Sequence, residues 1–438
     1  MIQIESIEEY QENNRIEAKK ALGGLPLSIW ETYSAFANTL GGVILLGVEE
    51  YRDKSFHTVD LPDPQRLVDE FTKILNNKER VSANILADSD IHIETIHGDR
   101  IIVIEVPRAR RYDKPVFVGD SMYSGTYRRN GEGDYHCTRE EIEAMLRDAA
   151  VHSADTKVLD TLDISVFDTS TVDRYLDVFH HVRTIDTGNI HTYLQSCVND
   201  HPTMAGLLMF GKYDRIKEVI PSYSLVLQDE ELEMNLFDFL YYARNRLCEI
   251  LDTETGSVIE MVITESLANC VINADYHGTV SIDIHIDEDK ITMRNPGTFR
   301  IPVSKARRGG LADPRNVFIM RMFSLVNIGK NTGSGVPAIY HAWHGEGFDE
   351  PQITQSFQPE QTILTLPLTE HNSDAWTTAS PEEIASLIIS YLTEHHTARR
   401  TEIAKYLNLG ERQTRKYLNQ LVKAQIIITH NKQYSLKA

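Results

Sequence analysis

Hydrophobic and polar positions in the first 150 residues follow both helical and strand-like patterns. The spacing of apolar residues predicts helices over residues 7–22 and 28–40. The run GGVILLGVEE, residues 41–50, predicts a buried strand, because it is short, apolar and bounded by glycines. The segment IHIETIHGDRIIVIEVP, residues 91–107, predicts a hairpin with its turn at HGDR.

Residues 160–370 combine a long apolar helix with strands. The stretch MVITESLANCVINADYHG, residues 261–278, has the apolar spacing of a helix that breaks near its last glycine. The alternation in TVSIDIHIDEDKITMRNPG predicts a hairpin that turns at residues 287–289, and QTILTLPL predicts a last strand.

Residues 380–438 follow the polar stretch TEHNSDAWTTASP, which is typical of a linker. Their pattern predicts three short helices and a hairpin, with Gly410 between the second and third helices and the strands turning near Asn431. Capping boxes mark two helix starts, at Ser380–Glu383 and, in the first block, at Thr138–Glu141.

The length of 438 residues suits about three domains, and 41% hydrophobic with 25% charged residues is ordinary for globular protein. The patterns place these domains at residues 1–150, 160–370 and 380–438. The expected fold class is therefore α+β and multidomain.

The net charge and the absence of targeting signals limit which partners the protein can bind and where in the cell we expect it. The net charge of −20 argues against a protein that coats nucleic acid with its whole surface, although local basic patches remain able to bind phosphate. No apolar run reaches the roughly 18 to 20 residues that span a bilayer, and the acidic start lacks the regions of a signal peptide. The four cysteines are scattered, which matches neither a zinc site nor a disulfide framework. We expect a cytoplasmic protein with reduced thiols and no membrane partner.

Glu265 and Asn269 interrupt the apolar helix within 261–278. Residues four apart share a helix face, so the two side chains can reach the same point. One interpretation is a partly solvated stripe in which Asn269 bonds a neighbouring carbonyl. The other is a metal and nucleotide site.

The surroundings of this helix, residues 200–370, resemble the GHKL-type ATPase fold in the divergent form found in bacterial proteins beside RecG helicase C-terminal segments. In that superfamily a helix carries Glu-x-x-x-Asn, which Glu265 and Asn269 match, and Asp275-Tyr276 match the usual continuation. The resemblance implies ATP as ligand, Glu265 as the general base for water, and Asn269 as a ligand of Mg²⁺ on the phosphates. A hard Mg²⁺ prefers oxygen ligands, and the Asn carbonyl is one.

The segment RNPG falls where better-known relatives carry an Asp-x-Gly-x-Gly box that holds adenine through its Asp. Asn295 stands in the place of that Asp, and Gly297 follows it. At the positions that the divergent family usually fills with Glu and His, this chain has Lys330 and Asn273. The departure at Asn295 bears on the contact with the base, and those at Lys330 and Asn273 bear on hydrolysis more than on nucleotide binding.

The segment GKNTGSG resembles the phosphate loop of the same family. Gly333 and Gly335, on either side of Ser334, permit positive φ, so that backbone N–H groups can approach an anion. A helix-capping turn would use the same residues. A helicase motor needs a Gly-x-x-x-x-Gly-Lys-Ser/Thr loop, which the sequence lacks, so unwinding is not expected.

Four segments of the first block together resemble the Schlafen AlbA-2 domain, once filed as a divergent AAA domain: ENNRIEAKK, NTLGGVILLGVEE, KPVFV and YRRNGEGDYHCTREEI. Some Schlafen relatives cleave RNA with three acidic residues, which Glu12, Glu17 and Glu49 match. Three converging carboxylates could hold a divalent metal and activate water. The alternative is that Glu17 pairs with a basic neighbour on a solvated helix face.

Basic residues of the first block could form a phosphate-contacting surface. They are Arg108, Arg110, Arg111, Lys114, Arg128 and Arg129.

Residues 380–438 resemble a winged helix-turn-helix. In that arrangement 411–423 is the recognition helix for a DNA major groove, and a dimerisation domain is the alternative. The DNA-facing residues would be Arg412, Gln413, Arg415 and Lys416, with Lys432 in the wing.

Together these features favour a homodimeric transcriptional regulator that binds double-stranded DNA and whose ATP-binding domain modulates that binding. The alternative function is a metal-dependent nuclease that acts on RNA, and a scaffold with decayed sites is a third.

Overall fold

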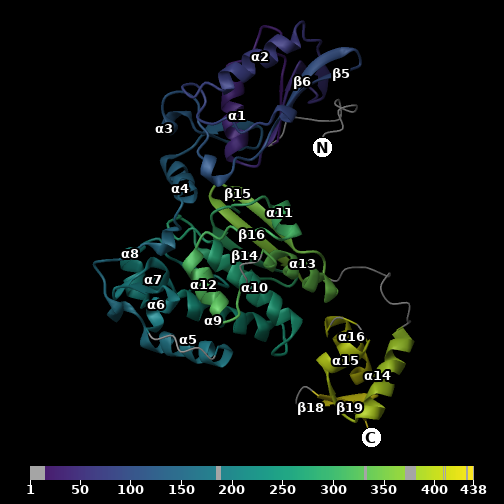
Figure 1. The fold of residues 1–438 in the computed structure, drawn as a ribbon. Helices are drawn as coiled ribbons and strands as arrows, with labels where there is room; N and C mark the ends of the chain where they lie inside the picture. The colour runs from purple at the N-terminus through teal and green to yellow at the C-terminus, as the bar shows by residue number, and fades with distance from the viewer. Residues whose placement is uncertain are drawn as a thin grey trace. The chain divides into compact units, whose positions relative to one another are not determined.

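The computed structural model describes residues 15–183, 189–329, 333–369, 381–407, 409, 411–430 and 433–437, with backbone alone for 381–383 and 411–413. The chain forms two compact units, Met1–His152 and Ser153–Ala438 (Figure 1).

A four-stranded sheet of order β1-β2-β6-β5 forms the centre of the first unit. β1 runs parallel to β2, and the hairpin predicted at 91–107 is confirmed by antiparallel β5 and β6. Alternate residues of β2 enter two separate cores, Ile44 on one face and Leu45 on the other, which explains its continuous apolar run. The bounds are β1 Ile16–Lys19, β2 Gly42–Leu46, β5 Ile91–Ile96 and β6 Asp99–Val106.

The prediction of a helix over 7–22 is wrong at its described end, because 16–19 form strand β1. The sequence IEAK favours helix by propensity, yet pairing with β2 buries Ile16 and leaves Glu17 and Lys19 part-exposed. Residues 7–14 lie outside the described part of the chain.

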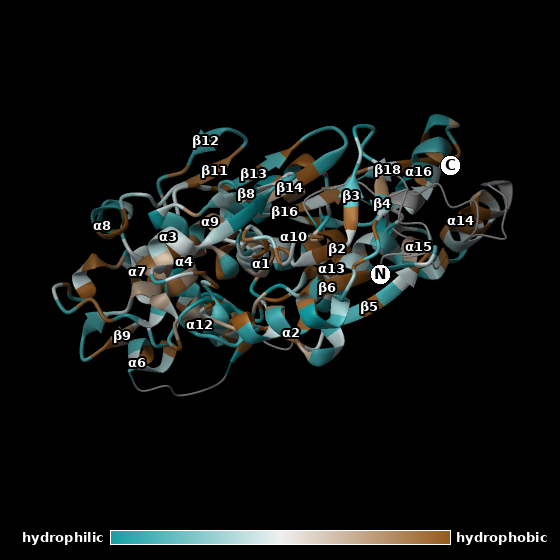
Figure 2. Cartoon of the chain, turned by 90° about the horizontal axis from the view of Figure 1, so that it is seen from above, coloured by the Kyte–Doolittle hydropathy of each residue, from teal (hydrophilic) through white to brown (hydrophobic). Residues whose placement is uncertain are grey.

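Helices α1 and α2 pack against the core that contains Ile44. The helix predicted over 28–40 is confirmed by α1. In α2 the buried residues Leu67, Phe71 and Leu75 recur at helical spacing, and Figure 2 shows the matching mixture of hydrophobic and hydrophilic positions. The remaining elements of this unit are α1 Ile29–Asn38, α2 Pro64–Leu75, α3 Met122–Gly125, α4 Arg139–Ala149, β3 Val48–Glu50, β4 Phe56–Thr58, β7 Tyr127–Asn130 and β8 Gly133–His136.

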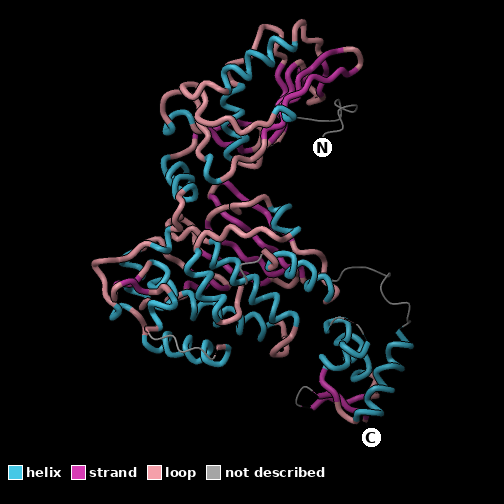
Figure 3. The backbone as a smooth tube through the Cα atoms, in the orientation of Figure 1, coloured by secondary structure: helices cyan, strands magenta, loops and turns pink. Residues whose placement is uncertain are grey.

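The second unit contains a six-stranded sheet of order β12-β11-β13-β14-β16-β15. Figure 3 shows strands, in magenta, and helices, in cyan, within this unit. The predicted hairpin around 287–289 is confirmed by antiparallel β13 and β14, and QTILTLPL lies in β16. The bounds are β11 Leu225–Leu227, β12 Glu230–Glu231, β13 Ile282–Ile286, β14 Lys290–Pro296, β15 Gln352–Phe357 and β16 Glu360–Pro367. A separate small pair is formed by β9 Cys197–Val198 and β10 His201–Pro202.

One hydrophobic core extends from Leu159 to Leu368 and joins this sheet to its helices. α10 is apolar on nearly all sides, as expected for a helix that is covered by neighbours all round. The helices are α5 Thr169–Val182, α6 Ile190–Leu194, α7 Met204–Phe210, α8 Tyr213–Val219, α9 Leu236–Ile250, α10 Val258–Asn273, α11 Val303–Arg308, α12 Val317–Leu325 and α13 Gly335–Gly345.

The C-terminal segment has its own core and a three-stranded sheet of order β17-β19-β18. Three helices and a terminal hairpin are present, as the pattern predicts. Gly410, Asn431 and the capping residue Ser380 lie outside the described residues. The bounds are α14 Pro381–His395, β17 Ala398–Arg399, α15 Arg400–Leu407, α16 Glu411–Lys423, β18 Ile427–His430 and β19 Gln433–Leu436.

Among the described residues, no helix has the length and apolar character needed to cross a bilayer. All four cysteines are free thiols.

Candidate nucleotide site and nucleic-acid surfaces

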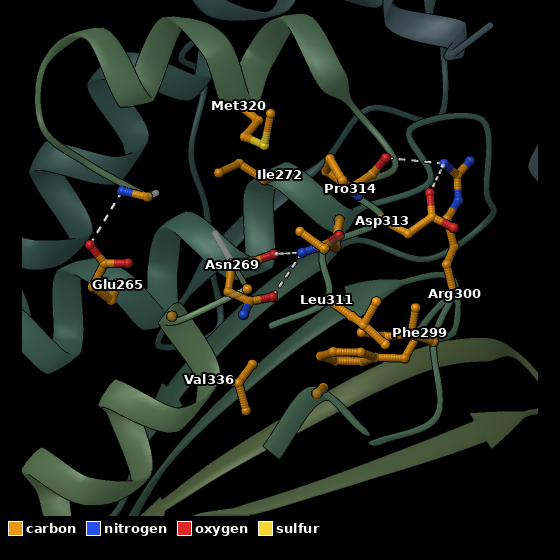
Figure 4. Close-up of a pocket in the computed structure, with 17 residues that line it drawn as sticks. Glu265, Asn269, Ile272, Phe299, Arg300, Leu311, Asp313, Pro314, Met320 and Val336 are labelled. Atoms are coloured by element: carbon orange, nitrogen blue, oxygen red, sulfur yellow. Dashed lines mark hydrogen bonds and ion pairs between the residues drawn. The ribbon is translucent and has the colours of Figure 1, made fainter. Parts of the chain in front are cut away.

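Glu265 and Asn269 of α10 line one cavity of about 710 Å³, part of which is open to solvent. Figure 4 shows the two side chains directed into this space, with Phe299, Leu311 and Val336 around it. The helix therefore presents a carboxylate and a carboxamide to the same volume, as their spacing predicts.

Both ends of α10 are fixed by local contacts. Ser257 caps its start by accepting a hydrogen bond from Glu260 N at 3.2 Å. Past its end, Asp275 N donates to Pro296 O at 2.9 Å, and the buried Tyr276 hydroxyl donates to Val271 O at 2.6 Å. The backbone of Asp275 thus ties the end of α10 to the end of β14, while Tyr276 bonds back to α10 itself.

Asn273 orients the carboxamide of Asn269. Asn273 Nδ2 donates to Asn269 Oδ1 at 2.8 Å and to the Asn269 carbonyl at 3.0 Å. A carbonyl oxygen has two lone pairs, so Asn269 Oδ1 keeps one for a further partner. Asn273 therefore acts as a positioning residue for an oxygen ligand.

Glu265 lies beside the start of α13. Its Oε1 accepts a hydrogen bond from Gly329 N at 3.3 Å, and a Cβ on Gly335 would lie 3.7 Å from Oε2. Ser334 is the N-cap residue of α13. The positive end of that helix therefore faces the cavity near the carboxylate.

Gly333 can be replaced by no other residue without movement of its surroundings. Its φ is +67°, and a Cβ there would lie 2.4 Å from Leu311 O. Gly333 and Gly335 both line the cavity, so the glycines of GKNTGSG meet the Glu-x-x-x-Asn pair in space. Lys330 lies outside the described residues.

Asn295 and Gly297 lie on a different part of the site. Asn295 lines a second cavity of about 340 Å³ that shares Asn269, Phe299 and Val336 with the first. Gly297, with φ +87°, leaves room for the Arg315 guanidinium, because a Cβ would lie 2.4 Å from Arg315 Nη1.

The buried Arg315 links three segments of the site. It donates to the carbonyl of Asn273 at the end of α10 and, at 3.0 Å, to that of Thr298 after β14. The guanidinium therefore holds the RNPG turn against the end of α10.

The two cavities suit a nucleotide in three respects. Asn269 offers an oxygen ligand for Mg²⁺, and Gly333 and Gly335 expose backbone in the wall of the same cavity. The buried Ser266 hydroxyl in the second cavity has no hydrogen-bond partner among the described residues. Within the described ranges no three His, Cys, Asp or Glu side chains cluster as a metal site. A Mg²⁺ ion here would depend mainly on phosphate and water oxygens.

Of the three acidic residues matched to a nuclease, Glu12 lies outside the described residues. Both carboxylate oxygens of Glu17 are engaged, with Lys19 Nζ at 2.7 Å and Arg129 Nη1 at 2.9 Å. Glu49 pairs with Lys20 at 2.8 Å. The described geometry is that of ion pairs between these carboxylates and neighbouring cations.

The candidate arginines of the first unit differ in exposure. Arg128 and Arg129 are 6% and 4% exposed and pair with Glu141 and Glu17 respectively, so they do not present their charge to a phosphate backbone. Arg111 Nη1 donates to the carbonyl of Asp148 at 2.6 Å.

Arg110 remains on the surface, with 84% of its side chain exposed beside Asp113. Arg108, Arg111 and Lys114 are of intermediate exposure, and Lys114 Nζ donates to the carbonyl of Asn38, so Arg110 is the most exposed of the six candidates.

In the C-terminal segment, α16 carries the proposed DNA-facing residues. Lys416 is exposed and Arg415 is partly exposed. The side chains of Arg412 and Gln413, and Lys432 as a whole, lie outside what the structure describes.

Several lining residues are absent from the sequence predictions. Ser266 could have been found, because it lies three positions before Asn269 on the same helix face. Arg300, Leu311 and Asp313 come from the two loops on either side of α11, between β14 and α12, and these loops have no periodic pattern to reveal their side-chain directions.

Comparison with protein families assigns two segments of this α+β protein. Residues 11–138 match the family described as "Schlafen, AlbA_2", and residues 280–366 match "Putative ATP-dependent DNA helicase recG C-terminal". The chain thus carries a Schlafen AlbA_2 segment and a RecG C-terminal-like ATPase segment, as the resemblances predict. This pair suggests a nucleic-acid-associated, ATP-binding protein.

Two further segments also match families. Residues 385–432 match the family "FaeA-like protein", and residues 143–226 match a domain of unknown function. The search of curated proteins found no match.

Two solved structures are similar to the chain. The DIP2311 protein from Corynebacterium diphtheriae is 16% identical, with a TM-score of 0.42 over 99% of this chain and 83% of its own. The N-terminal domain of a RecG-related protein from Nitrosomonas europaea is 27% identical, with a TM-score of 0.25 over 32% of this chain and 95% of its own.

Proposed function

We propose that the protein is a DNA-binding regulator whose middle domain binds ATP with Mg²⁺. The observation that carries the proposal is the meeting of Glu265, Asn269, Gly333 and Gly335 around one cavity. These residues lie up to 70 positions apart in the sequence, and together they provide the oxygen acceptors and the glycine backbone that a metal-bound phosphate group needs.

Each polar residue has a separate task in this proposal. Asn269 supplies a metal ligand that Asn273 orients, and Gly333 with Gly335 brings backbone N–H groups toward phosphate at the start of α13. Glu265 is the candidate general base, since its carboxylate lies beside that helix start. Bound ATP would bring the reactive phosphate, and these residues would hold it and exclude bulk water.

DNA contact belongs to the C-terminal domain in this proposal. Three helices followed by a hairpin, with exposed Lys416 early in the third helix, suit a winged helix-turn-helix in a homodimer on duplex DNA. The acidic chain as a whole repels DNA, so a local basic helix is the part that can bind it.

The nucleotide proposal is tested by titrating the protein with ATP and Mg²⁺ in a calorimeter. We expect Asn269→Ala to weaken binding by about tenfold or more, because a charged-ligand contact contributes roughly 1.5–3 kcal/mol. The control is Asn245→Ala, on the exposed surface of α9, which should bind as the wild type does. Equal affinity of Asn269→Ala and wild type would overturn the assignment of this cavity.

Glu265→Gln separates binding from hydrolysis. The amide keeps the size of the side chain but cannot act as a base, so ATP affinity should stay within about threefold while any turnover falls by about 10²-fold or more. Phosphate release measured at saturating ATP gives the second quantity. Unchanged turnover in Glu265→Gln would remove Glu265 from the catalytic role.

A further inference from the structure

α11 is a basic helix on an acidic chain. Its six residues, VSKARR, include Lys305, Arg307 and Arg308 and no carboxylate. The flanking residues extend this bias, because 299–312 contain four lysines or arginines and no Asp or Glu, whereas the whole chain has a net charge of −20. Such a local concentration of cations is a candidate contact for a polyanion.

Arg307 holds α11 in place within the domain. Its Cζ lies 4.4 Å from the centre of the Tyr340 ring in α13, and its guanidinium pairs with Glu350. α11 packs against α13 (Figure 1). Arg307 therefore serves mainly to fasten these two helices together.

Lys305 and Arg308 are available to a partner outside the chain. Both are exposed, and neither side chain has a hydrogen bond or ion pair with any residue that the structure describes. They lie three positions apart on one helix, so their side chains extend from the same face. Two neighbouring cations of this kind suit the phosphates of a nucleic-acid backbone.

The same helix forms part of the nucleotide cavity. Its buried Ala306 lines that cavity. Gly309, directly after the helix, lies against the start of α13, since a Cβ there would lie 3.1 Å from Gly333 O and 2.9 Å from Pro337 Cγ. A phosphate group bound at Gly333 would therefore contact the residues that hold the end of α11 in place.

We propose that α11 contacts the phosphate backbone of duplex DNA through Lys305 and Arg308, and that bound nucleotide controls this contact through Gly333 and Gly309. The inference rests on the proposed function, and it adds a DNA contact on the nucleotide-binding domain to that of the C-terminal domain. Two phosphate contacts supply only part of the affinity for a duplex, so α11 strengthens binding that begins at α16. The contact is independent of base sequence.

The test is the salt dependence of duplex binding by the full-length protein. Wild type and Lys305→Gln with Arg308→Gln are titrated against a labelled random-sequence duplex, by fluorescence anisotropy, at salt concentrations from about 50 to 200 mM. Each lost phosphate contact reduces the slope of log K against log salt by about 1, so the variant should lose about 2. Across this range the wild-type affinity should fall about tenfold more than that of the variant.

ATP with Mg²⁺ provides the second readout. It should change the duplex affinity of the wild type and leave that of the Gln variant unchanged. Calorimetry should give both proteins the same affinity for ATP, because neither Lys305 nor Arg308 lines the cavity.

Two further variants are matched controls. Arg215→Gln with Arg246→Gln changes the net charge equally, but removes exposed arginines that pair with glutamates of their own helices, so the slope should stay as in the wild type. Lys305→Arg with Arg308→Lys keeps both charges and should keep the slope. Gln has a high helix propensity, so α11 should form in the Gln variant.

The outcomes that would overturn the proposal are distinguishable. An unchanged slope in the Gln variant removes the DNA contact from α11, and a lower melting temperature with it would show that the two cations stabilise the helix end instead. A reduced slope for single-stranded RNA of equal length, but not for duplex, would make RNA the partner. If ATP changes duplex affinity equally in variant and wild type, control by the nucleotide fails. If the wild type binds no duplex, the proposed function fails as well.

Discussion

Glu17 and Glu265 show how the surroundings of a residue decide its chemistry. Both were candidates for catalysis, and both lie on regular elements beside polar neighbours. Glu17 is 12% exposed and sits between two cations, whereas Glu265 faces a cavity and the start of a helix. Sequence spacing alone could not separate these cases, because the partner Arg129 lies more than 100 positions away from Glu17.

Glu17→Gln tests whether the first carboxylate is structural. The Arg129 side chain alone is 1% exposed and pairs with both Glu17 and Asp134, so loss of one charge should destabilise the first unit by about 3–5 kcal/mol. Hydrogen exchange of β1 and β2 in the full chain measures that loss. Glu143→Gln, which removes an exposed partner of Arg139, should change stability by less than about 1 kcal/mol.

The competing nuclease hypothesis makes the opposite prediction for the same variant. Metal-dependent cleavage of single-stranded RNA by the wild type, lost in Glu17→Gln without faster exchange in β1, would show that this carboxylate serves catalysis. In that case the ion pairs with Lys19 and Arg129 would have to open to admit metal.

At the scale of elements, the sequence predicts the helices and strands whose hydrophobic patterns are long or regular. α10, the hairpins β5–β6 and β13–β14, and the capping box of α4 follow their predicted positions. The strand at 16–19 was not predicted, because four residues of high helix propensity become a strand only through pairing with β2. The cavity wall after β14 was not predicted either, because the loops on either side of α11 have no periodic pattern.

Asp155 lies in a 3-10 turn and connects that turn to the start of α12. Its carboxyl group should make the stability of the fold depend on pH. Its carboxylate accepts from Phe318 N at 2.8 Å and Ile319 N at 3.0 Å. Burial raises the pKa of Asp155 above its ordinary value of 3.8, against the opposite effect of these bonds and of the Ser153 hydroxyl. Folding therefore favours the protonated form, and the associated stability is present below the unfolded pKa and is lost as pH rises through the folded pKa.

Asp155→Asn removes this titration while it keeps an oxygen for the two N–H groups. The melting temperature of the wild type relative to Asp155→Asn should therefore fall as pH rises from below 3.8 toward neutrality. Thermal melts of both proteins over that range measure the difference. A difference that is flat, or that grows in favour of the wild type, would show that the bonds from α12 outweigh the effect of burial.

At the scale of the whole molecule, the proposed regulator needs nucleotide and DNA binding to be linked. If ATP with Mg²⁺ changes the affinity for a random-sequence duplex, DNA must change the affinity for ATP by the same factor. We expect a factor of about five or more, since typical coupling energies are 1–3 kcal/mol. Fluorescence anisotropy of labelled duplex with and without ATP, and ATP titrations with and without duplex, give the two factors independently.

Two variants test which residues carry the linkage between ATP binding and DNA binding. Asn269→Ala should bind duplex with the affinity of the nucleotide-free wild type at every ATP concentration. Arg415→Glu with Lys416→Glu should abolish duplex binding, whereas Lys423→Glu, in the last turn of α16, should retain it, because the start of a recognition helix is the part that enters the groove. If the duplex affinity does not change with ATP, or if the two measured factors differ, the proposed linkage fails. Nucleotide binding and DNA binding would then be independent functions of one chain.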